Sequence, residues 1–96
     1  MFDIRRLKVE DDTLFDSEDG AMAYVNEEID HALEKHGTGA FVSTHEILGV
    51  LDEEFEEFKR AIHKNDIDAC MDELAQVAQV AIFGIASILQ ARKDAR

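Results

Sequence analysis

The sequence has no proline, no tryptophan and one tyrosine among its 96 residues. Without proline, no position interrupts a helix by removing a backbone donor. The single cysteine, Cys70, excludes an intrachain disulfide and is typical of a reducing compartment. The opening stretch, "MFDIRRLKVEDD", lacks the apolar segment of a signal peptide. These features predict a soluble, cytoplasmic protein.

Basic side chains are also scarce, because 10 Lys and Arg face 22 Asp and Glu and leave a net charge of −12. This balance argues against binding to nucleic-acid phosphates or to anionic lipids, both of which need clustered cations. The longest apolar run, residues 77–89, is shorter than the roughly 20 residues of a membrane-spanning helix. We therefore expect no membrane and no nucleic acid, and interpret this run as a buried helix or a subunit interface.

Apolar residues recur at helical spacing over most of the chain. A first helix is predicted over residues 17–36, followed by a glycine, Gly37, of the kind that ends helices. A second is predicted from the capping-box sequence "STHE" to about His63. A third is predicted over residues 66–92, with Asn65 as its cap.

The order of these elements predicts an all-α fold, an antiparallel bundle of three to four helices per chain. Residues 17–96 would form one domain, and residues 1–16 an arm of uncertain structure. Gly84, in the interior of the third helix, is expected to bend or divide it.

The acidic stretch "LDEEFEEF" does not place all its carboxylates on one side of the second helix. With Ile47 at zero, Glu54 falls at roughly 340°, inside the apolar stripe, and Glu57 at roughly 280°, on its edge. Glu53 and Glu56 fall at roughly 240° and 180°, on the polar side. Two carboxylates are therefore predicted to turn inward and two outward.

The third helix repeats this arrangement. Glu73 falls inside its apolar stripe and Gln76 falls on the edge. No Lys or Arg lies in either stripe. Antiparallel packing would bring Glu54 and Glu57 opposite Glu73 and Gln76.

A carboxylate inside a stripe must be compensated, because burying an unpaired charge is costly. A metal ion is the best compensator for an oxygen-only ligand set, and Mg²⁺ is favoured, with Mn²⁺ possible as a substitute. Two alternatives stay open at this point. Each Glu can be a boundary residue whose head reaches water, and the chain can be an acidic helical adaptor or nucleic-acid mimic that binds a basic protein partner.

The run Glu53-Glu54-x-x-Glu57, followed by Glu73-x-x-Gln76, resembles the EExxE…ExxD signature of MazG-like all-α NTP pyrophosphohydrolases. The likeness is greatest to a phage-type subgroup that has ExxQ in place of ExxD. The resemblance covers residues 43–87, with the signature on two successive helices.

This resemblance implies hydrolysis of an NTP or dNTP to the monophosphate and pyrophosphate, with Mg²⁺ as cofactor. It implies that Glu54, Glu57 and Glu73 are the metal-binding and catalytic residues, and that Gln76 stands at the fourth ligand position. Glu53 would support these ligands without touching the metal. A homodimer or homotetramer would complete the core.

Overall fold

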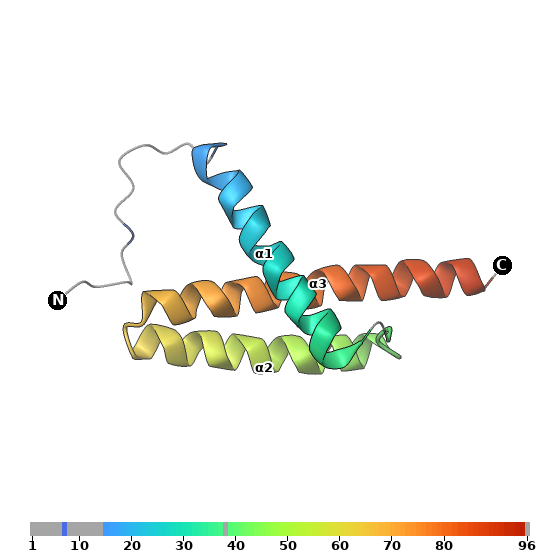
Figure 1. The fold of residues 1–96 in the computed structure, drawn as a ribbon. Coiled ribbons are helices and arrows are strands. Elements are labelled where there is room, and N and C mark those ends of the chain that lie inside the picture. Colours follow the sequence, from blue (N-terminus) through green and yellow to red (C-terminus); the bar gives the residue numbers. More distant parts are fainter. Residues whose placement is uncertain (1–6, 8–14, 38, 96) are drawn as a thin grey trace.

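The computed structural model describes residue 7, residues 15–37 and residues 39–95. Within them the chain forms helices α1 (Phe15–His36), α2 (Thr44–His63) and α3 (Ile67–Asp94), and no strand. α2 and α3 run side by side in opposite directions, and α1 crosses over them (Figure 1). The all-α class is confirmed.

α1 begins two residues before the position expected from the sequence. The rest of the expected N-terminal arm, residues 1–6 and 8–14, lies outside the described residues. These include the basic residues Arg5, Arg6 and Lys8.

The helix ends follow the local sequence. Ser43 caps α2 as predicted, since its Oγ accepts a hydrogen bond from the Glu46 N–H at 3.1 Å. Gly37 has φ of +75° and its N–H donates to the Leu33 carbonyl at 2.8 Å, the left-handed cap expected after α1. The expected cap of the third helix was wrong by one residue.

Asp66, not Asn65, caps α3, because the Asp66 Oδ1 accepts a hydrogen bond from the Ala69 N–H at 3.0 Å. Asn65 has φ of 55° and forms the turn before the cap. Asparagine tolerates this left-handed conformation better than most residues. Either residue type can cap a helix, so local sequence could not decide between them.

Gly84 does not divide α3, which continues unbroken through it. A Cβ placed on Gly84 would lie 3.2 Å from the Ile47 Cγ2 and 3.3 Å from its Cδ1. At the other end of the pair, Ala61 of α2 and Cys70 of α3 share a small buried cluster. Gly84 therefore allows close approach of α2 to α3.

We expect Gly84→Leu to destabilise the protein by about 1–3 kcal/mol, because the larger side chain would overpack against Ile47. Gly49→Leu is the matched control, since a Cβ at this exposed α2 position would meet nothing within 4 Å. Replacing a helical glycine there should stabilise α2 by about 0.5–1 kcal/mol. Thermal unfolding followed by circular dichroism would measure both. Equal shifts for the two variants would contradict the close approach.

The core between the helices is thin. Its buried hydrophobic residues are small or medium in size: Ala32, Ala61, Cys70, Ala75 and Val80. No large side chain among the described residues is completely buried. Seven large apolar side chains of α3, here called the α3 stripe, are exposed: Ile67, Met71, Leu74, Ile82, Ile85, Ile88 and Leu89. Much of the apolar surface of α3 thus has no cover within the described chain.

α3 is long and apolar enough to cross a membrane, judged by length and composition alone. Its qualifying window has a mean hydropathy of 1.6, and 22% of that window is buried. A core helix of a soluble protein can pass the same test. Since α2 lies along α3 and carries many exposed charges, inserting α3 would force those charges toward lipid. Our expectation of a protein without a membrane segment remains a prediction.

Candidate metal centre

Three carboxylates meet between α2 and α3, halfway along the helix pair. One ligand oxygen from each of Glu54, Glu57 and Glu73 can be chosen so that all lie within 4.8 Å of one another. Glu54 and Glu57 are one turn apart on α2, and Glu73 faces them from α3. We call these three residues the carboxylate cluster. They are the same three residues that the helical geometry of the sequence brings together.

The burial of the cluster is uneven. Glu54 and Glu73 are half-buried, and Glu57 is exposed. The Oε2 atoms of Glu54 and Glu73 are fully buried and have no hydrogen-bond partner. Within the described residues, no Lys or Arg forms an ion pair with the cluster. Two buried carboxyl oxygens are thus left without a compensating group.

The electrostatics reflect this crowding. Burial raises the pKa of Glu73 to about 8, and its hydrogen bonds with Glu54 and Glu57, together with their charges, act in the same direction. Burial also raises the pKa of Glu54, and the charges of Glu57, Glu53 and Glu28 contribute, while the hydrogen bond from Glu73 opposes the rise. With its pKa near 8, Glu73 is mainly protonated at neutral pH when no metal is bound.

A hard divalent cation fits this set of residues. All donors are oxygens, which Mg²⁺ and Mn²⁺ prefer, and the two unpartnered buried oxygens gain a ligand. The three donor oxygens lie within 4.8 Å of one another, and adjacent ligands of an octahedral Mg²⁺ are about 3 Å apart, so the side chains would draw together when they bind the ion. A positive ion would also displace the proton held by Glu73.

The other motif residues lie around the cluster. Glu53 and Glu56 are exposed, as the sequence geometry predicts. Glu56 pairs with Lys59 at 3.2 Å on the surface, which removes it from the site. Glu53 and the half-buried Gln76 line a cavity together with Glu54. Gln76 is therefore near the cluster, although no direct contact joins it to those carboxylates.

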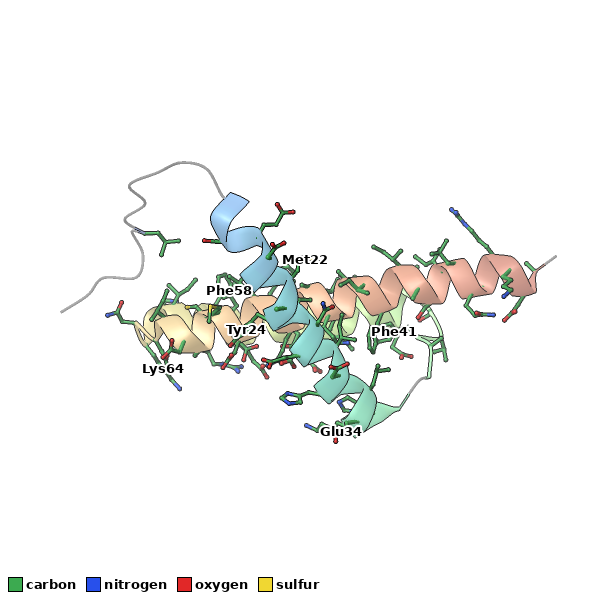
Figure 2. All side chains as sticks on the ribbon, turned by 45° about the horizontal axis from the view of Figure 1, so that its top comes forward. Met22, Tyr24, Glu34, Phe41, Phe58 and Lys64 are labelled. Carbon is green, nitrogen blue, oxygen red and sulfur yellow. The ribbon has the colours of Figure 1, made fainter. Side chains whose placement is uncertain are left out.

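α1 lies over this region, and Tyr24 is the residue that ties it to α3. The Tyr24 hydroxyl donates a hydrogen bond to the Asp72 Oδ1, on the residue next to Glu73. Figure 2 shows Tyr24 beneath the middle of α1, where carboxyl oxygens gather. Tyr24 lies off the apolar stripe of its helix, so helical periodicity alone gives it no packing role. Its hydrogen bond to α3 gives it a structural role.

The cavity has a volume of about 470 Å³ and is bounded by all three helices and the loop before α2. Its lining includes Glu54 and Gln76 on one side and His31 and Lys35 of α1 on another. The sequence has no Lys or Arg in the apolar stripes of the second and third helices, and periodicity within them cannot place a residue of α1 beside them. The only sequence feature that indicates the direction of His31 and Lys35 is their i, i+4 spacing, which places both on the same side of α1 as Ala32. Ala32 packs inward.

A scan against protein-family models gives no match, and searches of curated proteins and of solved structures find no significant similarity. The MazG-like resemblance therefore depends on the motif residues and on their positions in the helices.

Proposed function

We propose that the chain is a MazG-like, Mg²⁺-dependent nucleotide pyrophosphohydrolase. The observation that carries the proposal is the convergence of Glu54, Glu57 and Glu73 within 4.8 Å, with two buried oxygens that lack partners. A surface made acidic only for solubility, or for mimicry of nucleic acid, has no use for inward carboxylates, because each costs folding energy. The geometry therefore favours metal binding over an adaptor role.

In this proposal Glu54, Glu57 and Glu73 hold the metal, and Gln76 offers a neutral amide oxygen beside them. The bound Mg²⁺ would neutralise phosphate charge and lower the pKa of a water molecule. The overall reaction adds water to an NTP or dNTP and releases the monophosphate and pyrophosphate. Glu53, at the edge of the cavity, would add negative charge without binding the metal.

The proposal includes assembly as a homodimer or homotetramer in the cytoplasm. Its support is the α3 stripe, in which Ile85 is 60% exposed and Leu89 is 57% exposed. Exposed apolar side chains that gather on one helix often mark an interaction surface. The thin core within one chain also favours assembly, because a partner helix packed on the α3 stripe would bury the apolar surface that α2 leaves uncovered.

The test is a panel of NTPs and dNTPs incubated with Mg²⁺ and assayed for pyrophosphate. We expect pyrophosphate from at least one nucleotide, and a loss of about 100-fold or more in Glu54→Gln, because the amide offers the metal no negative charge. Mn²⁺ should support turnover, and EDTA should abolish it. Orthophosphate as the product would indicate a different reaction.

Glu56→Gln is the matched control for this assay. It makes the same chemical change on the same helix, at a side chain that is 59% exposed and pairs only with Lys59 among the described residues. Turnover should be unchanged. If both variants lose the same activity, the effect arises from net charge and not from a metal ligand. If the wild-type protein neither binds Mg²⁺ nor releases pyrophosphate, the adaptor alternative becomes the better reading.

A further inference from the structure

A highly acidic chain that acts on a polyphosphate faces an electrostatic problem. Its net charge of −12 repels the substrate, and the metal can offset only part of this repulsion. On α2, Arg60 lines a shallow groove with Glu53 and Glu57, outside the cavity that contains Glu54 and Gln76, and Lys59 pairs with Glu56 on the surface. A cation on the cavity side of Glu54 must therefore come from another element.

α1 provides such a group. His31 and Lys35 line the cavity that also contains Glu54 and Gln76. A shallower groove beside it is lined by Glu28, His31, Glu34, Lys35 and Gln76, so these two basic residues lie near Gln76. No described carboxylate forms an ion pair with Lys35, in contrast to Lys59. Its ammonium group is available to a ligand.

The geometry of α1 explains this placement. His31, Ala32 and Lys35 share one face of the helix, and Ala32 is only 8% exposed. A residue as small as alanine allows α1 to lie close to α3, so its basic neighbours reach the cavity edge. α1 approaches α3 and makes no close backbone approach to α2 among the described residues. The space left between α1 and α2 forms part of the cavity.

The opposite end of the cavity is apolar. Phe41, Val80 and Phe83 line it, one to two turns along α3 from Gln76. Ser87 holds this end together, because its hydroxyl accepts a hydrogen bond from the Phe41 N–H at 2.9 Å and donates one to the Phe83 carbonyl at 2.8 Å. These bonds hold the backbone of Phe41 against α3 near Phe83, and the two aromatic rings offer a stacking surface for a nucleobase.

We propose that this cavity is the nucleotide site, with the polyphosphate between the carboxylate cluster and the Lys35–His31 pair and the base toward Phe41 and Phe83. The inference rests on the proposed function and adds the substrate-binding residues to it. The volume of about 470 Å³ falls within the range of about 300–1,000 Å³ typical of small-molecule sites. The neutral Gln76 has a use here, because an aspartate at this position would compete with phosphate for Lys35.

The test separates phosphate binding from catalysis. Titration calorimetry with inorganic tripolyphosphate and Mg²⁺ should show affinity about tenfold or more weaker in Lys35→Ala, since a charge-assisted contact to phosphate is lost. Lys35→Arg should retain most of the affinity. Lys59→Ala removes the same charge from α2, outside the cavity, and should bind like wild type. Phe83→Leu should leave tripolyphosphate binding intact and weaken binding of a non-hydrolysable nucleoside triphosphate analogue.

The inference is overturned if Lys35→Ala binds tripolyphosphate like Lys59→Ala, or if the wild-type protein does not bind it. Circular dichroism of each variant would show that the fold is kept. Failure of the proposed function has a different signature: tripolyphosphate would still bind through Lys35, but no nucleotide would yield pyrophosphate. Loss of turnover in Glu54→Gln with normal affinity in Lys35→Ala would keep the proposed function and reject this site.

Discussion

Glu73→Gln is expected to reduce pyrophosphate release about 100-fold or more while making the metal-free protein more stable at alkaline pH. The two effects have one cause. Glu73 places a carboxyl group with a buried, unpartnered oxygen against two other carboxylates. Glutamine fills the same space with a neutral group, so it removes the repulsion and also removes the charge that would hold the metal.

The opposite signs make this variant informative. A residue needed only for folding would lose stability and activity together. A residue whose carboxylate serves only solubility would change neither. Pyrophosphate release and thermal unfolding in EDTA, both at about pH 8.5, would measure the two effects. Glu56→Gln, which alters an exposed carboxylate, should change neither result. Lower stability of metal-free Glu73→Gln would show that Glu73 is a structural partner.

The carboxylate cluster could be predicted from sequence because it depends on one helical period. Residues at i and i+3 on α2 and a residue inside the stripe of α3 must meet if the two helices pack along their apolar faces. That packing follows from the short link between them. The sequence alone therefore predicts that Glu54 and Glu73 point inward. It also predicts that Glu53 and Glu56 point outward, and the structure agrees on all four.

The basic side of the cavity could not be predicted in the same way. It depends on where α1 crosses α3, and periodicity within one helix gives no crossing position. The role of Gly84 was misjudged for a related reason, since propensity describes the cost of a glycine in one helix and not the approach of Ile47 from another. Local patterns predicted the elements and their faces, whereas contacts between elements required the tertiary structure.

The largest effect on stability is expected from Mg²⁺ itself. At about 100 times its dissociation constant, a ligand that binds only the folded state stabilises it by about 2.7 kcal/mol. For a domain of this size the thermal midpoint should rise by roughly 10–20 °C. The increase should be greater at high pH, because the metal needs the ionised form of Glu73 and must displace a proton at lower pH.

The direction in which stability changes with pH follows from the pKa of Glu73, which folding raises from 4.5 to about 8. Between these values the folded protein retains a proton that the unfolded chain has lost, so the stability of the metal-free protein falls as pH rises through this window and levels off above about pH 8. Mg²⁺ counters this loss by replacing the proton. The gap between midpoints measured in Mg²⁺ and in EDTA should therefore widen from about pH 6 to about pH 8.5.

Glu73→Gln provides the control, since it lacks the titrating group. Its metal-free stability should vary less with pH across this window, and Mg²⁺ should give only a small increase in midpoint. A Mg²⁺ effect that is the same in wild type and in Glu73→Gln would place the ion elsewhere on the acidic surface. An effect that does not grow with pH would mean that the proton on Glu73 is not the one that the metal displaces.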